Sequence, residues 1–421
     1  MENKSITIVG AGLYGCLTAL KIKNKFKKIK INLVDENDDI LNAFKNLNFK
    51  NFKINNGFHA IDLPRAERLY NFLKHYLKIK FIEKKQKKFV IIDNIILEEN
   101  FDVNKVNYKI KKFFLEKNIN TKNYNTIKKN ISNKLIKILK LCSKRYCSNF
   151  ADVYHLFFPW FLPKQYKYIN KEDEGEIFRL KIRKELISSS HAFPKNYLFY
   201  SLKKKFKQKL KEKKINILCN SKIIFENNNL YLNEISKKKK IESDIIFLCN
   251  APLYILKQSK HLMLDLTQNK RFLVNLILKV DQNIDYFSEI LCANKNFPEL
   301  SRISFLKKDK FKTVLQLEIF LAKKNLCNKF FFNQRLKNFF FHLQNFKVIK
   351  YKIIDFKITR NVFFPSKKIV DQSRKYIDDI VNLHKLKIKG YYPILPINMA
   401  KAWLYSEKNL NYINSLNKNI K

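Results

Sequence analysis

The chain has 421 residues, of which 46% are apolar, a formal net charge of +49 at pH 7 and only six glycines. Because the lysines are spread over the whole length and greatly outnumber the arginines, we expect the charge to be mainly a compositional background, and nucleic acid is not the expected partner. Seven scattered cysteines without a CxxC pair argue against a metal site, and no apolar run of about eighteen residues predicts a membrane span.

The first elements form a strand–helix–strand unit. Residues 5–9 (SITIV) are typical of a short buried strand, 13–25 of a helix and 29–34 of a second strand. The turn GAGLYG, 10–15, stands between the first strand and the helix and holds three of the six glycines. In a dinucleotide fold these glycines allow a tight turn, close approach of a pyrophosphate, and close packing of helix on strand. We therefore expect a dinucleotide site lined by Gly10, Ala11, Gly12, Leu13, Tyr14 and Gly15.

Two acidic residues, Asp35 and Glu36, follow the second strand. A carboxylate at this position accepts hydrogen bonds from ribose hydroxyls, and it would repel the 2′-phosphate of NADP. Glu36 is the slightly preferred ribose ligand, ahead of Asp35. Cys16, just inside the helix, is expected to be a small packing residue.

The remaining elements alternate in type along the chain. Residues 52–64 predict a strand and a turn, 65–78 a helix, and the Lys- and Asn-rich region 80–150 short strands and helices. Residues 197–213 predict an amphipathic helix with lysines on its solvated face. The later predictions are strands at 215–219, 221–225, 229–233 and 241–252, a strand-rich region at 271–322, helices near 334–345 and 370–383, a strand at 386–389 and a helix from about Asn398.

Several segments line up in order with one superfamily. ITIVGAGLYGCLTA with INLVDEN, NNGFHAI at 55–61, AFPKNY at 192–197, IESDIIFLCNAP at 241–252 and KGYYPILPINMAKAW at 389–403 resemble segments of FAD-dependent oxidoreductases of the flavin amine oxidase, protoporphyrinogen oxidase and UDP-galactopyranose mutase type. The usual double glycine after the second strand is absent, and PKNY stands where PxGG is expected. These departures leave the subfamily open and make mutase activity the less expected option.

The resemblance implies an α/β fold: a Rossmann-like FAD-binding domain of the glutathione reductase type with an inserted α+β substrate domain. It assigns residues 1–62, 192–255 and 385–421 to a discontinuous FAD-binding domain, and 63–191 and 256–384 to the substrate or cap domain. FAD fits better than NAD because nucleotide-domain strands recur late in the chain, whereas a simple NAD dehydrogenase completes that domain in one block.

The resemblance also implies the site residues. His59 would lie near the flavin, with a purely structural histidine as the alternative, and Asn398 and Met399 would present a helix N-terminus to the flavin. Arginine suits carboxylate or phosphate recognition, so Arg302 is a candidate at the reaction centre. Arg65, Arg183 and Arg360 are candidate substrate-binding residues, although Arg65 could simply cap its helix.

The leading expectation is an amine oxidase-like FAD-dependent oxidoreductase of a small polar or anionic substrate, a nucleotide-activated sugar or an amine. One alternative is a flavin-dependent isomerase similar to UDP-galactopyranose mutase. Another is a non-enzymatic polyanion-binding protein that keeps a relic nucleotide fold. The first strand is not preceded by a signal peptide, so a cytoplasmic protein is expected. The sequence does not determine the oligomeric state.

Overall fold

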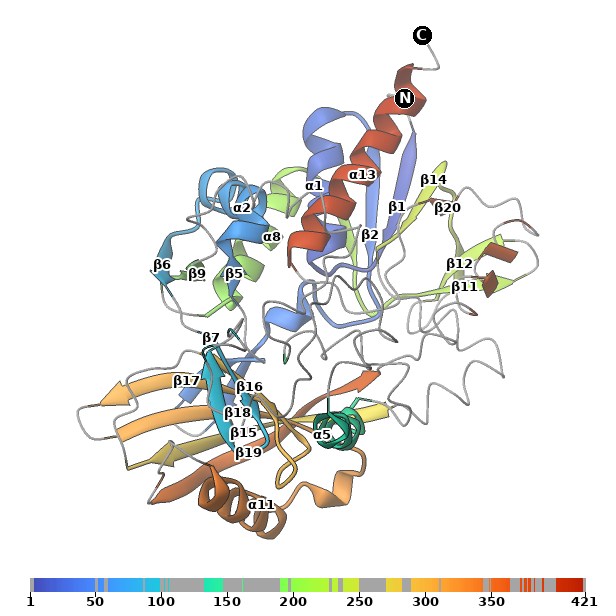
Figure 1. The fold of residues 1–421 in the computed structure, drawn as a ribbon. Helices are drawn as coiled ribbons and strands as arrows, with labels where there is room; N and C mark the ends of the chain where they lie inside the picture. Colours follow the sequence, from blue (N-terminus) through green and yellow to red (C-terminus); the bar gives the residue numbers. More distant parts are fainter. Residues whose placement is uncertain are drawn as a thin grey trace.

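The computed structural model describes the residues that carry the two main sheets and their helices (Figure 1). The described ranges are 4–49, 52–56, 60–85, 88–98, 132–146, 190–195, 198–226, 229–233, 238–249, 270–281, 289–309, 312–343, 350–363, 388–389 and 399–418, together with the single or paired residues 102, 105, 161, 348, 372, 375–376, 378–379 and 382.

The first main sheet is parallel and has the strand order β10–β2–β1–β14–β20. Its strands are β10 (Asn216–Leu218), β2 (Lys30–Val34), β1 (Ser5–Val9), β14 (Ile245–Leu248) and β20 (Ile388–Lys389). The central strand β1 is mostly apolar, and it is buried except at its first residue, as expected of a strand covered on both faces. The sheet therefore unites strands from three distant parts of the chain.

Three helices pack around this sheet: α1 (Leu13–Lys25), α8 (Tyr200–Glu212) and α13 (Met399–Lys418). Helices α1 and α13 lie side by side although they come from opposite ends of the chain (Figure 1). Helix α8 buries Leu202, Phe206 and Leu210 in the same core, while lysines cover its outer side, as the four-residue spacing predicted.

Smaller elements surround the parallel sheet. An antiparallel sheet joins β5 (Ile61–Asp62), β9 (Ser190–Pro194) and β6 (Phe81–Lys85), and another joins β11 (Lys222–Glu226), β12 (Asn229–Asn233) and β13 (Lys238–Lys240). The predicted helix 65–78 is an α-helix, α2 (Leu63–Asn71), that continues as a π-helix, η2 (Phe72–Tyr76).

The second main sheet has seven strands in the order β19–β15–β18–β17–β16–β7–β8. Their bounds are β19 (Tyr351–Phe363), β15 (Lys270–Val280), β18 (Lys312–Leu321), β17 (Leu300–Asp309), β16 (Glu289–Ala293), β7 (Lys88–Ile92) and β8 (Ile95–Glu98). Helix α11 (Lys329–His342) covers one face, where it inserts Phe332, Leu336 and Phe339 into an apolar core. The strand-rich region expected at 271–322 is thus four long strands of one sheet.

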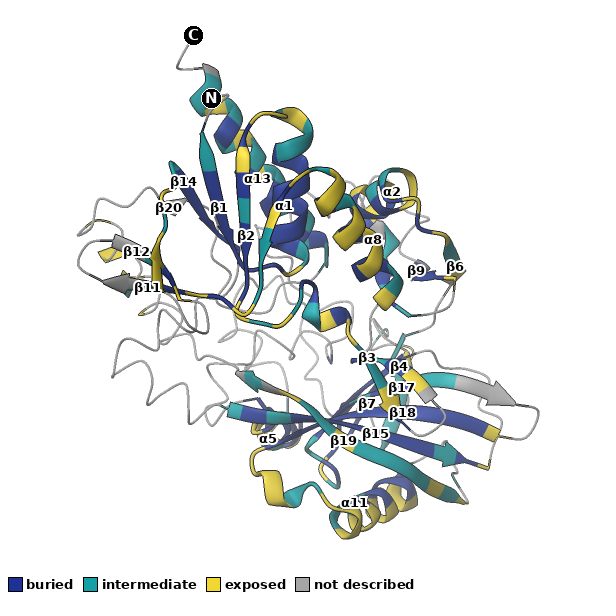
Figure 2. Cartoon of the chain, turned by 180° about the vertical axis from the view of Figure 1, so that it is seen from behind, coloured by how far each residue is buried: buried dark blue, intermediate teal, exposed yellow. Residues whose placement is uncertain are grey.

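A hairpin connects the two main sheets. It consists of β3 (Asn46–Phe49) and β4 (Phe52–Asn55), preceded by the short 3-10 helix η1 (Asn42–Phe44). Phe49 and Ile54 pack on Ile277 and Val314, on the face of the seven-stranded sheet opposite α11. In Figure 2 this hairpin lies between the parallel sheet and the seven-stranded sheet. Helix α5 (Asn133–Ser143) and the 3-10 helix η8 (Lys324–Leu326) complete the described elements.

The fold class expected from the sequence, α/β with a Rossmann-like domain, is confirmed. No helix among the described residues is long and apolar enough to span a bilayer. The helix expected at 370–383 falls mostly outside the described residues. The residue boundaries assigned to the two domains stay predictions.

Candidate functional site

The glycine-rich turn joins the carboxyl end of β1 to the N-terminus of α1. Gly10 has a φ of 100°, a left-handed conformation that glycine adopts without strain. Its N–H donates to the carbonyl of Val34, the last residue of the neighbouring strand β2, over 2.7 Å. Gly12 is the N-cap of α1 and provides no side-chain cap, so the first amide groups of the helix are not covered by a capping side chain.

The second and third glycines have different surroundings. A Cβ atom on Gly15 would lie 1.8 Å from the carbonyl oxygen of Gly10, so this helix can approach the turn only with glycine at that position. A Cβ atom on Gly12 would meet no atom of the described residues within 4 Å. The turn is therefore tightly packed toward the protein at Gly15 and open at Gly12, the arrangement that a dinucleotide pyrophosphate requires.

Asp35 is held against this turn. It follows the last residue of β2 and is buried, and its Oδ2 accepts a hydrogen bond from the N–H of Ala11 over 2.6 Å. Its Oδ1 accepts from the backbone and side-chain nitrogens of Asn37 over 2.9 and 2.6 Å. Glu36 is exposed. The geometry therefore favours Asp35 as the carboxylate beside the turn, in contrast to the slight preference for Glu36 drawn from the sequence.

The first turn of α1 is also tied to the C-terminal helix. Asn409 of α13, which is 2% exposed, donates from Nδ2 to the hydroxyl oxygen of Tyr14 over 2.8 Å and to Oγ1 of Thr18 over 3.3 Å. Cys249, directly after β14, lies in the same cluster and donates its thiol to Thr18 Oγ1 over 3.8 Å. A lone asparagine in a helix has no sequence signature of such a role, so sequence reasoning missed Asn409.

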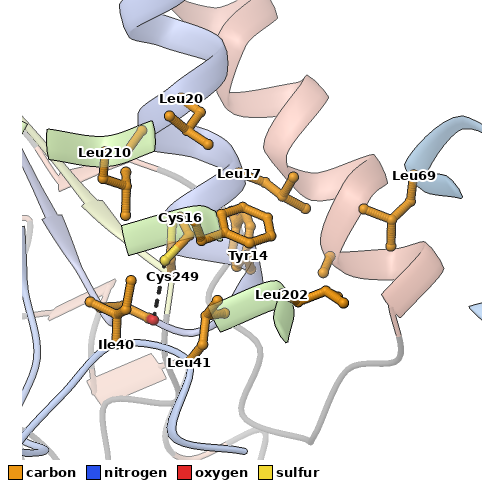
Figure 3. Close-up of a cluster of buried hydrophobic side chains, with 14 of the residues drawn as sticks. Tyr14, Cys16, Leu17, Leu20, Ile40, Leu41, Leu69, Leu202, Leu210 and Cys249 are labelled. Atoms are coloured by element: carbon orange, nitrogen blue, oxygen red, sulfur yellow. Dashed lines mark hydrogen bonds between the residues drawn. The ribbon is translucent and has the colours of Figure 1, made fainter. Parts of the chain in front are cut away.

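The cysteines around the turn are packing residues. Burial raises the pKa of the Cys16 thiol well above its ordinary value, and burial likewise raises the pKa of Cys249 to about 12. Both thiols therefore stay protonated at neutral pH and are poor nucleophiles. Figure 3 shows them within the buried cluster that includes Tyr14, Leu17, Leu20, Ile40, Leu41, Leu69, Leu202 and Leu210.

The candidate residue Arg302 lies on β17 of the seven-stranded sheet, away from the glycine turn. Its Nε is 2.8 Å from Oε1 of Glu289, and its Nη1 is 3.7 Å from Oε1 of Glu318. Burial disfavours its charge, but the two carboxylates outweigh burial and raise the pKa of Arg302. The guanidinium is thus engaged by two protein carboxylates, which argues against the expected recognition of an anionic substrate.

Arg360 lies on the edge strand β19, which is separated from β17 by β15 and β18, and it is in register with Leu273 of β15. Burial lowers the pKa of Arg360, and the nearby positive charge of Arg302 adds to this, whereas Glu318 opposes it. The structure therefore brings Arg302 and Arg360 to one sheet, around Glu318.

The other candidates are less completely described. His59, Arg183 and Asn398 lie outside the described residues, and only the backbone of Arg65 is described, in α2. Met399 is the first residue of α13 and packs against the core beneath the parallel sheet. The roles expected for these residues stay predictions.

The sequence of the chain was compared with protein-family models and with curated protein sequences. A family model for NAD(P)-binding Rossmann-like domains matches residues 8–76. No curated protein sequence matches the chain. The family match covers the end of β1, the glycine turn, α1 and Asp35, so the Rossmann-like character of this unit is shown.

Solved structures are similar over nearly the whole chain. Reduced UDP-galactopyranose mutase has a TM-score of 0.65 at 10% identity and covers 98% of this chain and 96% of its own. A protein of Exiguobacterium sp. 255-15 assigned as a protoporphyrinogen oxidase has a TM-score of 0.60 at 12% identity, with 97% and 98% covered. A putrescine oxidase with redesigned cofactor binding has a TM-score of 0.52 at 11% identity, with 98% and 99% covered. The resemblance inferred from the sequence is therefore confirmed at the level of the fold.

Proposed function

We propose that the protein is an FAD-dependent oxidoreductase. The observation that carries the proposal is the glycine turn: Gly15 permits close packing on Gly10, Gly12 faces open space, and Asp35 is fixed beside the turn. A fold like that of UDP-galactopyranose mutase and putrescine oxidase supports FAD as the dinucleotide. The low sequence identity to these proteins leaves the subclass to experiment.

Residues of the glycine turn, Asp35 and the start of α13 would hold the cofactor. The uncapped amides at the N-terminus of α1 would bind the pyrophosphate, and Asp35 would accept hydrogen bonds from the ribose hydroxyls. Asn398 and Met399 would present the N-terminus of α13 to the flavin. FAD, when bound, supplies the acceptor for a hydride, while the protein orients the substrate and excludes water.

For the substrate we propose a class: a small polar molecule, such as a nucleotide-activated sugar or an amine. His59 is proposed near it from the resemblance described above, and Arg65 and Arg183 because arginine suits the recognition of carboxylates and phosphates. We also propose a small-molecule partner and a cytoplasmic location.

The first test is the visible absorption spectrum of the purified protein before and after heat release of any ligand. Two flavin bands, with FAD in the released fraction, are the expected result. A colourless protein that also fails to take up added FAD would contradict the proposal.

Two glycine variants sharpen this test. Gly12→Ala adds a methyl group where the protein has none within 4 Å, so it should fold normally but bind FAD at least tenfold more weakly, since the methyl group occupies the pyrophosphate side. Gly15→Ala should instead fail to fold, because its Cβ atom would collide with the Gly10 carbonyl. Thermal unfolding and FAD titration separate the two effects, and a Gly12→Ala protein with unchanged FAD affinity would speak against a pyrophosphate at this turn.

A matched pair of acidic variants tests the ribose contact. Asp35→Asn should weaken FAD binding about tenfold to a hundredfold, the usual range for losing hydrogen bonds to a charged group. Glu36→Gln is the control and should bind FAD normally because Glu36 is exposed. The reverse ranking would restore Glu36 as the ribose ligand.

A flavin-dependent isomerase is the second candidate function, supported by the TM-score of 0.65 to UDP-galactopyranose mutase. Product analysis without an electron acceptor distinguishes the two. An oxidoreductase stops after one turnover under these conditions, whereas an isomerase continues.

A further inference from the structure

The two faces of the seven-stranded sheet differ in chemistry. The face toward α11 is apolar, with Leu276, Leu278, Leu315 and Leu317 in its core. Strands alternate their side chains between faces, so the intervening residues point to the side of the β3–β4 hairpin. On that side the central strands carry polar side chains, which are buried except for the half-buried Arg302. Figure 2 shows the buried residues of these strands in dark blue. We call Asn275, Glu289, Arg302, Ser304, Gln316 and Glu318 the polar face.

Strand register arranges the polar face in two neighbouring rows. One row runs across β16, β17 and β18 as Glu289, Ser304 and Gln316. The other runs across β17, β18 and β15 as Arg302, Glu318 and Asn275. Directly opposed side chains in an antiparallel sheet lie about 5 Å apart, so the members of each row are neighbours.

The charges of the polar face are balanced. Glu289 and Glu318 flank Arg302, and Arg360 is close enough to Glu318 to be influenced by its charge. Two carboxylates therefore stand beside two guanidinium groups. Among the described residues of the polar face, a further buried charge, whether the anion of a phosphate or the cation of an amine, would meet no surplus of the opposite charge. Its desolvation would therefore be uncompensated by these residues.

One hydroxyl in the polar face has no hydrogen-bond partner among the described residues. Ser304 is 3% exposed, and its Oγ makes no hydrogen bond to them, although it lies between Glu289 and Gln316 in register. Gln316 cannot donate to it readily, because its Nε2 already donates to Oδ1 of Asn275 over 2.6 Å and to the Asn55 carbonyl over 3.4 Å. Leaving a buried hydroxyl unpaired is energetically unfavourable, so a missing partner is expected.

A second unpaired polar atom lies close by in the chain. Asn56 follows Asn55, whose carbonyl accepts from Gln316, and its Oδ1 is also buried without a hydrogen-bond partner. Asn55 and Asn56 begin the segment NNGFHAI, 55–61, for which the resemblance implies a place near the flavin. The hydrogen bond from Gln316 to the Asn55 carbonyl therefore links the polar face to the start of this segment.

We propose that the polar face binds an uncharged, hydroxyl-bearing part of the substrate, such as a sugar ring or a polyol. A hydroxyl group donates and accepts at once, so it can pair with Ser304 while donating to the carboxylate of Glu289. The proposal deepens the proposed function and rests on it, because it names the substrate class of the same enzyme. It also gives Arg302 a new role: it neutralises the two carboxylates and does not bind a substrate anion.

The test uses three matched probes on the full chain: methyl glucoside, which is neutral, glucuronate, which is anionic, and glucosamine, which is cationic. Saturation-transfer NMR detects weak binding of each, with and without added FAD. We expect transfer to methyl glucoside, and weaker transfer to the two charged sugars. No transfer to methyl glucoside, or a preference for a charged probe, would overturn the proposal.

Two serine variants on the same strand make the test specific. Ser304→Ala removes the unpaired hydroxyl, so it should abolish transfer to methyl glucoside while leaving the melting temperature unchanged or raised. Ser301→Ala is the control: its hydroxyl already pairs with that of Tyr146 over 3.0 Å, so it should lower the melting temperature and keep the transfer. Transfer that survives in Ser304→Ala would overturn the assignment of Ser304, whose missing partner would then be a water molecule.

The same samples separate this proposal from the proposed function. A protein that binds FAD but no methyl glucoside keeps the oxidoreductase proposal and loses the substrate class. A protein that binds methyl glucoside but no FAD loses the oxidoreductase proposal, and the polar face is then a sugar site in a protein of another kind.

Discussion

At the scale of single residues, Lys21 of α1 is an unusual buried charge. Its Nζ lies 3.2 Å from the centroid of the Trp403 ring and 4.0 Å from Oε1 of Glu407 on α13, which in turn pairs with Arg68 of α2 over 3.2 Å. Burial lowers the pKa of Lys21 to about 7, and the repulsion from Arg68 adds to this, although Glu407 opposes it. The ammonium therefore loses its proton near neutral pH in the folded protein.

This shift makes stability depend on pH. Between about pH 7 and the ordinary lysine value of 10.5, the unfolded chain keeps a proton that the folded chain has lost. Stability should therefore rise with pH across this window, by up to about 1.4 kcal/mol per pH unit. Lys21→Met should remove the rise and be most stabilising, relative to the native protein, at or below pH 7. Denaturant unfolding from pH 6.5 to 10 measures it.

Lys25, exposed in the last turn of the same helix, gives the matched control. Lys25→Met removes one positive charge, as Lys21→Met does. Because Lys25 is exposed, its loss should leave the slope of stability against pH the same as in the native protein. Equal slopes in all three proteins would mean that Lys21 titrates as an ordinary surface lysine.

At the scale of elements, the contact between α1 and α13 depends on one asparagine. Asn409→Leu keeps the size of the side chain but deprives the Tyr14 hydroxyl and Thr18 of their donor. We expect a loss of about 1–3 kcal/mol in unfolding free energy. Because Tyr14 belongs to the glycine turn, FAD affinity should fall as well.

The control is Asn411→Leu, at an exposed position of the same helix, which should change neither the unfolding free energy nor the FAD affinity. Denaturant unfolding and FAD titration would show both effects, and an Asn409→Leu protein as stable as Asn411→Leu would refute the role of this contact.

Local patterns made some elements predictable from the sequence. The glycine spacing located the turn, because no other residue type meets the contact at Gly15 or the positive φ at Gly10. The four-residue repeat located α8, because a helix must bury one side. The sequence did not identify which of Asp35 and Glu36 lies beside the turn. That choice depends on β2 ending at Val34, and the boundaries of elements are poorly encoded in local sequence.

Interactions between strands were beyond local patterns. Arg302 was singled out as rare, but its pairing with Glu289 and Glu318 depends on which strands are neighbours and on their register. A partial signal existed in β18, where Gln316 and Glu318 alternate with leucine and isoleucine in a strand that is buried on both faces. Polar residues at every second position of such a strand indicate a polar face, although not what it binds.

At the scale of the whole molecule, the net charge of +49 must be reconciled with the proposed function in small-molecule oxidation. The exposed lysines do not gather on one element. Lys204, Lys205 and Lys207 lie on α8, Lys238–Lys240 form all of β13, and Lys352 and Lys357 lie on β19. These elements belong to different parts of the fold (Figure 2), so the charge forms a diffuse positive field and no single basic groove is apparent among the described residues.

A diffuse field predicts a particular response to salt. Duplex DNA should be retained at low ionic strength, but its dissociation constant should be weaker than micromolar at about 0.15 M salt, because the binding then consists only of counterion release. FAD binding should persist over the same range, since the contacts at the glycine turn and Asp35 are short and buried. Titrating one preparation with DNA and with FAD at increasing salt measures both.

Micromolar or tighter DNA binding at 0.15 M salt, in a protein that takes up no FAD, would instead favour a polyanion-binding protein with a relic nucleotide fold. Retained FAD with salt-labile DNA binding would mean that the lysines act at most by attracting anions to the surface, while the chemistry belongs to the turn at Gly12 and to the polar face.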